Sequence, residues 1–245
     1  MTQGNSQRVV VIIPARNEAE TIGYVVGEVR KHYPDLSIIV IDDASTDETG
    51  AIARRAGAEV VRTPIRLGYG GAVQTGLKLA YRRNYDLVIL MDADGQHDPA
   101  YIGHLISASR EYDFVIGSRF LGEASYRIPF VRKVGMKIFS KIASAFVGKP
   151  IIDTSSGFQA LRRNVFTLFA LGDYPVDFPD ADMIIWVAKH GYRVGEVPVR
   201  MHERKAGKSM ISGLSSSLRY ALKMPLAILV TLLRVPSRSR EESKR

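Results

Sequence analysis

The sequence of 245 residues contains no cysteine. This absence excludes a disulfide framework, Cys-ligated zinc, iron–sulfur clusters and a cysteine nucleophile. Histidine is also scarce, and its five copies are scattered, so a His-based zinc site is not expected. Long apolar runs are missing as well: none approaches the roughly 20 residues that a membrane-spanning helix needs. The N-terminal segment, residues 1–7, is short and polar, so we expect no signal peptide and a protein that stays on the cytosolic side.

Acidic residues are scarce near the C-terminus. The whole chain has 34 Lys and Arg against 25 Asp and Glu, a formal net charge of +9. Residues 200–245 hold 11 of these basic residues and 3 of the acidic ones, which leaves residues 1–199 close to neutral. Because 46% of the residues are hydrophobic, the chain can bury a core, which excludes a wholly disordered protein. We therefore expect a nearly neutral globular body that carries a basic C-terminal segment.

Apolar runs alternate with helical patterns in the first half of the chain. The expected strands are residues 8–15, 36–43, 58–62, 87–91 and 114–117. Helical spacing predicts helices over residues 18–31, 45–55 and 69–83, and another after Pro99. Ser45 and Glu48 read as a capping box for the second helix. This alternation predicts an α/β fold with a Rossmann-like, mostly parallel sheet covered by helices on both faces.

The second half contains two segments with basic and apolar residues at helical spacing. Residues 126–148 predict a basic amphipathic helix, which either packs as a solvated face over the core or lies on an anionic membrane surface. Residues 180–189 predict a helix and residues 192–200 a strand. Residues 214–233 form a core helix or, as we favour, an interfacial one. We expect one domain over residues 1–211, a membrane-associating amphipathic helix over 212–235, and a disordered basic tail over 236–245.

Acidic residues follow two of the expected strands. Asp92 and Asp94 come directly after the apolar run 87–91, and two carboxylates side by side repel each other unless a cation lies between them. Mg²⁺ uses one or two carboxylates together with substrate phosphates, so these residues predict a metal and diphosphate site. Asp42 and Asp43 occupy the equivalent place on another strand. Ligands of such sheets bind beyond the carboxyl ends of the strands.

A glycine-rich segment, residues 68–72, opens the third expected helix. Glycines such as Gly70 let the backbone approach a ligand, and helix N-termini attract anions. The segment is not a dinucleotide fingerprint, because Val73 occupies the third glycine position, and no Gly-Lys-Ser/Thr follows as in a P-loop. These departures argue against NAD enzymes and P-loop NTPases, and Gly70 becomes a candidate substrate-binding position.

Taken in order, these motifs resemble the family 2 inverting glycosyltransferases with the GT-A fold, and among them the dolichyl/polyprenyl-phosphate mannose synthase branch. The resemblance is carried by residues 11–18, 40–47, 68–76, 91–97 and 117–119. It covers about residues 9–211, nearly the whole expected body. It implies a GT-A domain and a divalent cofactor, Mg²⁺ or Mn²⁺.

The resemblance also implies residues that contact the nucleotide-sugar donor. They are Pro14, Arg16, Glu18, Ile41, Asp43, Asp92, Ala93, Asp94 and Gln96. The first three match positions that contact the nucleoside, with Arg16 where the family usually has Tyr. Ile41 and Asp43 match positions where the base is read. Asp92 and Asp94 match the metal and diphosphate ligands, with Ala93 and Gln96 beside them.

A second implied set serves the acceptor and a closing loop. It consists of Arg119, Arg132, Asp180, Asp182, Arg204, Lys208 and Ser209. Arg119 and Arg132 match positions that hold the acceptor phosphate. Asp180 and Asp182 match an acidic pair before the helix that carries Trp186. Arg204 and Ser209 belong to a loop that closes over the donor, in which Met210 stands where the family often has Lys, and Lys208 is the candidate replacement.

The implied activity is metal-dependent inverting transfer of a hexose from a GDP-mannose-type or UDP-glucose-type donor. The acceptor would be a polyprenyl or dolichyl phosphate, reached by peripheral association with the inner, cytosolic face of the membrane. A phosphate acceptor needs cations to hold it and no general base, roles for Arg119, Arg132 and Arg204. A hydroxyl acceptor would need a base, for which Asp180 and Asp182 are the candidates.

Other functions stay open at this point. The enzyme could act on a sugar or glycolipid hydroxyl, or the chain could bind nucleotide sugars at a membrane surface without turnover. A nucleotidylyltransferase also uses strand-end Asp residues, but its glycine-rich N-terminal loop is absent. We expect no nucleic-acid partner, because the basic residues form no nucleic-acid-binding motif.

Overall fold

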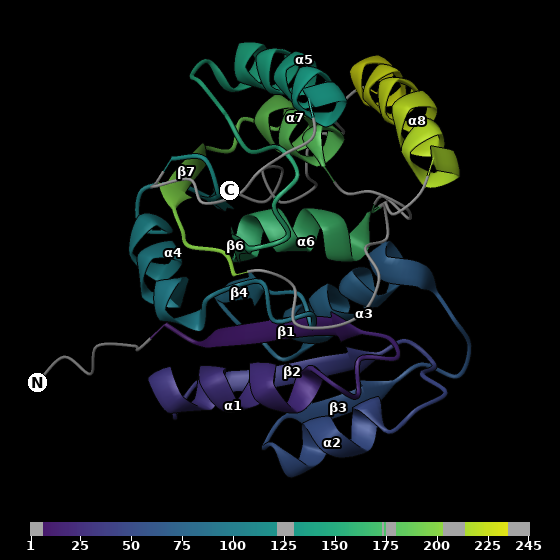
Figure 1. Ribbon diagram of the computed structural model, residues 1–245. Helices are drawn as coiled ribbons and strands as arrows, with labels where there is room; N and C mark the ends of the chain where they lie inside the picture. Colours follow the sequence, from purple (N-terminus) through teal and green to yellow (C-terminus); the bar gives the residue numbers. More distant parts are fainter. Residues whose placement is uncertain (1–6, 122–129, 173, 175–179, 203–213, 235–245) are drawn as a thin grey trace, which may run out of the picture.

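The computed structural model describes residues 7–121, 130–172, 174, 180–202 and 214–234. Within these ranges, residues 130–135 and 214–223 are described by their backbone alone. A seven-stranded sheet forms the centre of the described chain (Figure 1). Its strands are β1 (Val9–Ala15), β2 (Ser37–Asp42), β3 (Glu59–Arg62), β4 (Leu87–Leu90), β5 (Phe114–Ser118), β6 (Gln159–Arg162) and β7 (Val194–Pro198).

The strand order is β3-β2-β1-β4-β6-β5-β7, and β6 alone among these strands runs antiparallel to its neighbours. The helices are α1 (Ile22–His32), α2 (Thr49–Arg55), α3 (Gly68–Arg82), α4 (Ile102–Ala108), α5 (Phe130–Val147), α6 (Arg163–Leu171), α7 (Ala181–Lys189) and α8 (Leu214–Leu233). A 3₁₀ turn, η1 (Pro99–Tyr101), precedes α4. The expected α/β fold with a mostly parallel sheet is confirmed.

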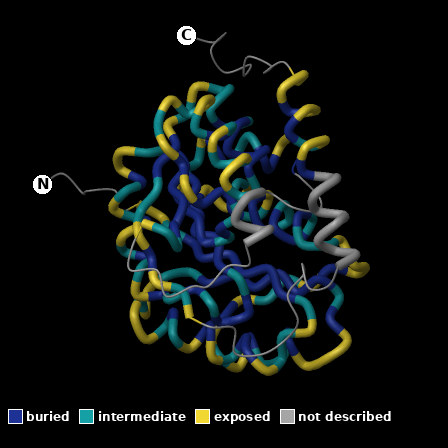
Figure 2. Tube along the Cα trace, turned by 45° about the horizontal axis from the view of Figure 1, so that its top comes forward, coloured by how far each residue is buried: buried dark blue, intermediate teal, exposed yellow. Residues whose placement is uncertain are grey.

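The sheet is buried on both faces because successive strand residues point to opposite sides. On one side, Val10 and Ile12 of β1 belong to the core that contains Leu77 of α3. On the other side, Val11 and Ile13 belong to the core that contains Val25 of α1. Figure 2 shows the result as a dark-blue interior beneath a more exposed shell. The continuous apolar strands of the sequence are therefore explained by double-sided burial.

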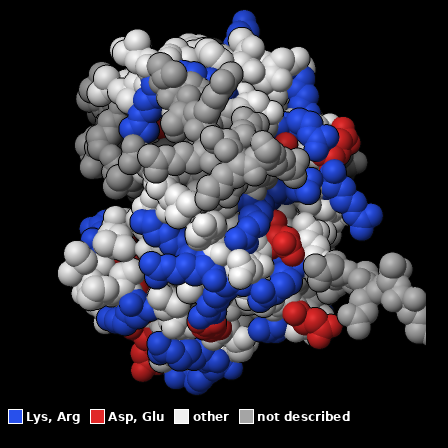
Figure 3. Space-filling view, turned by 180° about the vertical axis from the view of Figure 1, so that it is seen from behind, with Lys and Arg blue, Asp and Glu red and all other residues white. Residues whose placement is uncertain are grey.

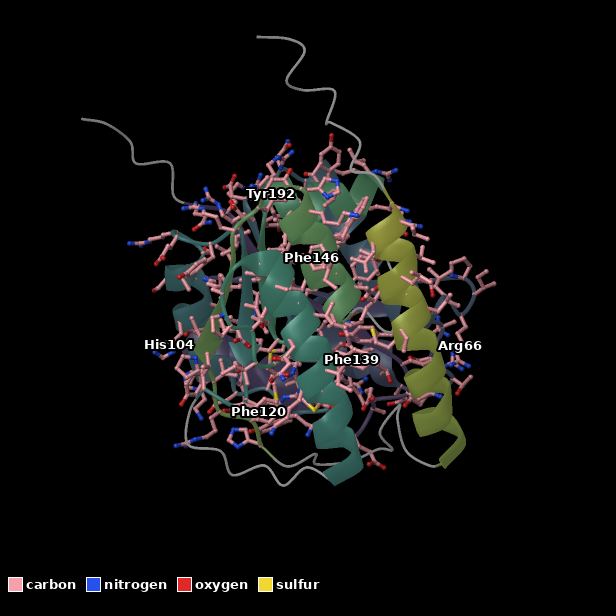
Figure 4. All side chains as sticks on the ribbon, turned by 90° about the horizontal axis from the view of Figure 1, so that it is seen from above. Arg66, His104, Phe120, Phe139, Phe146 and Tyr192 are labelled. Atoms are coloured by element: carbon pink, nitrogen blue, oxygen red, sulfur yellow. The ribbon has the colours of Figure 1, made fainter. Side chains whose placement is uncertain are left out.

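Three helices form a layer at the top of the molecule in Figure 1. There α7 packs against both α5 and α8, and the view from above shows the two outer helices side by side (Figure 4). The side chains of Met224, Ile228 and Thr231 on α8 are buried. The ammonium of Lys189, at the end of α7, donates to the carbonyls of Thr231 (2.9 Å) and Leu232 (2.8 Å) in the last turn of α8 and of Arg234 (2.6 Å) just after it.

The other face of α8 remains apolar and exposed. Leu226, Leu229, Val230 and Leu233 recur at helical spacing on this face and are 59%, 51%, 42% and 74% exposed. We call these four residues the α8 apolar face. One face of α8 is thus a core element, while the opposite face has the character expected of an interfacial helix. None of the helices in the described part of the chain is long and apolar enough to cross a bilayer.

Two boundary predictions were wrong. The first helix begins at Ile22 rather than at residue 18, because the Glu18 N–H donates to Thr49 Oγ1 and Asn17 adopts a positive φ of 52°. The second helix begins at Thr49, so Ser45 and Glu48 form no capping box. Ser45 Oγ instead accepts a hydrogen bond from the Asn17 N–H at 3.1 Å.

The charges of the body are unevenly distributed. Seen from behind, Lys and Arg side chains gather over the lower half of the molecule, the half that holds β1–β3 (Figure 3). Exposed residues of α3 that carry such charge include Lys78 and Arg82. The body is close to neutral by count but has a basic face, so positive charge gathers there as well as in the C-terminal segment (Figure 3).

Candidate active site

The predicted site residues lie beyond the carboxyl ends of parallel strands. Asp43 follows β2, Asp92 follows β4 closely, and Arg119 follows β5 directly. Because these strands run in the same direction, their ends meet at one edge of the sheet. One segment from the second half of the chain, Met201 and His202, reaches the same edge: Met201 forms a β-bridge with His97, and the His202 N–H donates to Gln96 O at 2.8 Å.

Asp43 is buried and its carboxylate is already engaged. It accepts hydrogen bonds from the backbone N–H groups of Leu67 (2.6 Å) and Gly68 (2.9 Å), where α3 begins. It also accepts one from Thr63 Oγ1 at 3.3 Å. Asp43 thus anchors the glycine-rich segment to the sheet edge, and its role in reading a base stays a prediction.

The neighbouring Asp42 has a structural role. It is buried, pairs with Arg62 at 3.0 Å and accepts from the Ser45 N–H at 2.9 Å. The next residue but one, Ala44, adopts a positive φ of 50°. A non-glycine residue in that region is strained, and such strain is found most often at functional turns.

The residues predicted to contact the nucleoside divide into two groups. Arg16 Nη1 donates to the carbonyl of Asp43 at 3.1 Å, so this side chain does lie at the site. Glu18 lies near it at the end of β1 and accepts from Thr21 Oγ1 at 3.0 Å. Pro14 and Ile41 pair across β1 and β2, and both are buried. The Ile41 side chain belongs to the core under α3.

Asp92 has close neighbours on three sides. Tyr69 Oη donates to its Oδ1 at 3.0 Å. The Asp92 N–H donates to Nδ1 of His97 at 3.0 Å, and Nε2 of the same ring lies 3.6 Å from Oδ2. On the third side is Gly157: a Cβ there would lie 2.8 Å from Oδ2 and 3.1 Å from Oδ1.

The turn after Asp92 shapes the second carboxylate. Asp94 Oδ1 accepts from the Gln96 N–H at 2.9 Å, and Gly95 between them has a positive φ of 77°. Ala93 is buried among apolar residues of the core, so its side chain points away from the site edge. The roles of Ala93, Gln96 and the two carboxylates in binding the donor stay predictions.

A divalent ion would be compatible with this set of oxygen atoms. Within the part of the chain that the structure describes, no group of three or more His, Asp or Glu residues could hold a metal. Hard divalent ions nevertheless bind at one or two carboxylates when substrate phosphates and water complete the coordination. Asp92 and Asp94 supply that number of carboxylates, and the missing Cβ of Gly157 leaves room beside the first.

His97 is fully enclosed and neutral. Burial lowers the pKa of His97 to about 4, the nearby Asp94 acting in the opposite sense and Arg119 in the same one. Its ring stacks on Phe158, with centroids 5.0 Å apart and an interplanar angle of 12°. Because Nδ1 accepts a hydrogen bond, the single ring proton lies on Nε2. The ring therefore supports the main chain of Asp92.

Arg119 forms a tight pair with Asp153. Its Nε and Nη2 donate to Oδ2 (2.7 Å) and Oδ1 (2.6 Å) of that carboxylate, and Nη2 also donates to Ser155 Oγ at 2.7 Å. Asp153 is itself held by Glu196, whose Oε1 accepts from the Asp153 N–H at 2.7 Å. Burial raises the pKa of Glu196. Asp153 and Glu196 thus hold Arg119 in place at this edge of the sheet.

The predicted acidic pair and Asp92 act on the same buried tyrosines. The charges of Asp92, Asp180 and Asp182 all raise the pKa of the buried Tyr174, after the larger effect of burial itself. Those of Asp92 and Asp180 act likewise on Tyr69. Asp182 is buried at the first turn of α7, and its Oδ1 accepts from the Asp180 N–H at 3.1 Å. Burial raises the pKa of Asp182 to about 6.

Part of the prediction falls outside the described residues. The side chain of Arg132 and the whole loop with Arg204, Lys208 and Ser209 belong to this part. Gly70 is described and is buried in the first turn of α3. The roles of all these residues in binding donor or acceptor stay predictions.

Three residues of the site were missed from the sequence. Tyr69 lies within the glycine-rich segment, but nothing in the sequence connects it with Asp92, 23 positions away. Asp153 and Gly157 follow the basic helical segment and belong to none of the motifs described in the sequence analysis. A buried carboxylate opposite a strand-end arginine becomes visible only when β6 is placed between β4 and β5.

Comparisons with known proteins agree with this geometry. The profile of the family described as "Glycosyl transferase family 2" matches residues 10–169. The chain is 34% identical to an undecaprenyl-phosphate mannosyltransferase of Micrococcus luteus, over 84% of this chain and 88% of that protein. It is 33% identical to a polyprenol monophosphomannose synthase of Mycolicibacterium smegmatis, over 89% of this chain and 85% of that protein.

A solved structure shares the fold at lower sequence identity. The glucosyl-3-phosphoglycerate synthase of Mycobacterium tuberculosis, crystallised with Mn²⁺ and uridine-diphosphate-glucose, superposes with a TM-score of 0.66. The match covers 95% of this chain and 81% of that one, at 20% identity. The GT-A architecture expected from the sequence is therefore confirmed.

Proposed function

The chain belongs to glycosyl transferase family 2, and on that premise we propose that it transfers a hexose from a nucleoside-diphosphate sugar to a polyprenyl phosphate. It is a glycosyltransferase, and what remains to be assigned is the donor and the acceptor. The observation that carries the proposal is the meeting of donor-side and acceptor-side residues: Asp92 and Asp94 follow β4, Arg119 follows β5, and these two strands run in the same direction on either side of β6. The carboxylates suited to a metal–diphosphate and the arginine suited to a phosphate thus share one edge of the sheet.

The donor half of the proposal rests on Asp92 and Asp94. When bound there, Mg²⁺ or Mn²⁺ would supply positive charge against the diphosphate that leaves the sugar. The position of that charge would be set by the two carboxylates. Tyr69 and His97 hold Asp92, while the turn to Gln96 holds Asp94. The fold relative that was crystallised with Mn²⁺ and uridine-diphosphate-glucose supports this donor class. GDP-mannose and UDP-glucose are both candidates.

The acceptor half rests on the relatives and on Arg119. Both curated relatives described above are named for polyprenyl-type phosphate acceptors, and each match covers most of both chains. A phosphate acceptor is already an anion, so it needs no base, only donors that hold it in line with the sugar carbon. Arg119 is fixed by Asp153 and has little conformational freedom left to lose when a phosphate binds. We assign Arg132 and Arg204 to the same task.

A matched pair of acceptors tests the proposal. The protein is incubated with GDP-mannose or UDP-glucose, Mn²⁺ or Mg²⁺, and either undecaprenyl phosphate or undecaprenol, which differs only by the phosphate. Release of nucleoside diphosphate and a glycosylated lipid with the phosphate alone is the expected result. Transfer to undecaprenol or to a glycolipid hydroxyl, with none to the phosphate, would overturn the acceptor assignment.

Asp182 favours a second candidate, transfer to a hydroxyl. A carboxyl group with a pKa of about 6 is suited to take a proton near neutral pH, and the charge of Asp182 reaches the same Tyr174 as that of Asp92. Asp182→Asn and Arg119→Ala separate the two reactions. A phosphate acceptor predicts that the arginine variant loses turnover and the aspartate variant retains most of it, and a hydroxyl acceptor predicts the reverse.

We also propose that the α8 apolar face lies on the membrane that holds the acceptor. A helix packed on one side and apolar on the other can insert its exposed side chains among lipid headgroups. The residues before and after it include many of the C-terminal basic residues, which anionic lipid would attract. The assignment to the inner, cytosolic face rests on the sequence alone.

A further inference from the structure

Two side chains hold Asp92 without being ligand candidates themselves. The first is Tyr69, whose Oη donates to Oδ1 at 3.0 Å. A carboxylate can only accept, so the phenol is the donor in this hydrogen bond.

Tyr69 also connects the two acidic strand ends. It is the second residue of α3, directly after Gly68, whose N–H donates to Asp43 at 2.9 Å. Consecutive residues of one helical turn thus bind the carboxylate that follows β2 and the carboxylate that follows β4. Because the first turn of α3 is anchored at Asp43, the phenol of Tyr69 has a fixed origin from which to hold Asp92.

The second side chain is His97, which fixes the backbone of Asp92. Its Nδ1 accepts the Asp92 N–H at 3.0 Å, and its ring is kept in place by stacking on Phe158. The protonated Nε2 faces Oδ2 at 3.6 Å, which is beyond hydrogen-bonding distance but favourable to a negative oxygen. The phenol of Tyr69 therefore restrains Asp92 through its side chain, and the imidazole of His97 restrains it through its main chain.

We propose that Tyr69 and His97 are positioning residues that hold the Asp92 carboxylate in the one orientation in which it can bind a metal–diphosphate. The inference rests on the proposed function, because it assigns a role toward the ligand of that same site. A free carboxylate would lose rotational entropy on binding the ion, whereas one already hydrogen-bonded has lost it on folding. Groups that orient metal ligands in this way typically contribute about 10- to 100-fold in metal affinity.

Tyr69→Phe removes the hydrogen bond and little else, and Tyr81→Phe is its control. Tyr81 lies on the same helix, is also partly buried against the core, and has its ring beneath Arg163 rather than near Asp92. Binding of Mn²⁺ is measured by electron paramagnetic resonance with GDP and, separately, with UDP, at a temperature well below the melting point of each protein. We expect about 10- to 100-fold weaker Mn²⁺ binding in Tyr69→Phe and unchanged binding in Tyr81→Phe.

Rescue by metal distinguishes positioning from a general loss of structure. If Tyr69 acts through the affinity for metal, excess Mn²⁺ restores the turnover of Tyr69→Phe toward that of the wild type. For His97, the Asn variant places an amide oxygen near the position of Nδ1 and keeps an acceptor for the Asp92 N–H, whereas Ala does not. His97→Asn should therefore retain more Mn²⁺ affinity than His97→Ala.

The outcomes separate this inference from the proposed function. Wild-type Mn²⁺ affinity in both Tyr69→Phe and His97→Ala, with a wild-type protein that binds Mn²⁺ and nucleotide, would overturn the positioning roles alone. A wild-type protein that binds no Mn²⁺ with either nucleotide would overturn the metal-dependent function and the inference together. Weakened binding that excess Mn²⁺ restores supports both.

Discussion

Both carboxylate oxygens of Asp153 bind the guanidinium of Arg119, with Nε–Oδ2 and Nη2–Oδ1 distances of 2.7 and 2.6 Å. Asp153 also accepts from the Arg119 N–H at 3.0 Å, so it binds main chain and side chain of the same residue. The carboxylate is wholly buried and the arginine side chain is 12% exposed. Planar, bidentate pairing of this kind fixes the direction of the guanidinium, which lysine could not match.

Asp153→Ala should destabilise the protein strongly. Removing one partner of a buried ion pair leaves the other charge without compensation, which typically costs about 3–5 kcal/mol. Urea unfolding, followed by circular dichroism, measures the loss. Glu48→Gln is the control, because the Glu48–Arg55 pair has the same charges but its side chains are 76% and 65% exposed. Equal effects of the two substitutions would contradict the role given to Asp153.

Those parts of the site that depend on local sequence could be predicted. The strands that contain the continuous apolar runs end at Asp42 and Leu90. Parallel pairing of such strands is enough to bring the acidic residues that follow them to one edge of the sheet. The Asp92-Ala93-Asp94 turn is likewise local, and its position needed only the strand before it. Arg119 likewise follows β5 directly, although it was predicted from the family resemblance.

Contacts between distant segments were not predictable from the sequence. Ser45 and Glu48 have the spacing of a capping box, but Asn17, 28 residues earlier, donates its N–H to Ser45 and replaces that local pattern. In the same way, Tyr69 fits a glycine-rich helix start, and only the fold brings its phenol to Asp92. Such hydrogen bonds depend on strand order, which periodicity does not encode.

Gly157→Ala should impair the site more than the fold. The added Cβ would lie 2.8 Å from Asp92 Oδ2, so the carboxylate would have to move. We expect Mn²⁺ binding to weaken by about tenfold or more, measured with GDP or UDP as above, together with a small change in melting temperature.

Gly27→Ala is the matched control for this substitution. Gly27 lies exposed in α1, where a Cβ would meet nothing within 4 Å. Alanine is the better helix former by about 1 kcal/mol, so this variant should melt at a higher temperature and bind Mn²⁺ normally. A Gly157→Ala protein that binds Mn²⁺ as tightly as Gly27→Ala would show that Asp92 needs no such space.

Asp182 should make the stability fall as the pH rises. Its pKa is raised from 3.8 to about 6 in the folded protein, so the folded state binds more protons than the unfolded state between these values. The stabilising contribution of the protonated carboxyl is therefore complete below about pH 4 and is lost as the pH rises through about 6. Between about pH 5 and 8 the loss amounts to about 1–2 kcal/mol.

Asp182→Asn isolates this effect. The amide oxygen can still accept from the Asp180 N–H, but the side chain no longer ionises. Urea unfolding in EDTA at the two pH values should show that the variant gains stability relative to wild type at the higher pH. A difference between the two proteins that stays constant with pH would contradict the raised pKa.

Lys189→Met should loosen the end of α8. The ammonium donates to three carbonyls at the C-terminus of that helix, and methionine keeps the length of the side chain without the donors. Hydrogen bonds to a charged donor typically contribute about 1.5–3 kcal/mol, so hydrogen exchange of the amides over residues 224–233 should accelerate. Lys31→Met, at an exposed residue paired only weakly with Glu28 at 3.4 Å, should leave this exchange unchanged. Similar exchange in both variants would remove Lys189 as the anchor of α8.

Leu229→Glu combined with Leu233→Glu should abolish membrane binding if the α8 apolar face docks on lipid. The two side chains are 51% and 74% exposed, so charges there can be solvated in the free protein and should leave its stability almost unchanged. At an interface the same charges would have to lose water and would face anionic headgroups. Flotation with vesicles of phosphatidylglycerol and phosphatidylcholine measures the bound fraction. Ile65→Glu is the control, because Ile65 is 66% exposed but lies in the connection between β3 and α3 and so does not belong to the α8 apolar face. If the double variant floats with the vesicles as the wild type does, α8 is not the docking element; if Ile65→Glu is lost from them as well, added negative charge rather than this face accounts for the effect.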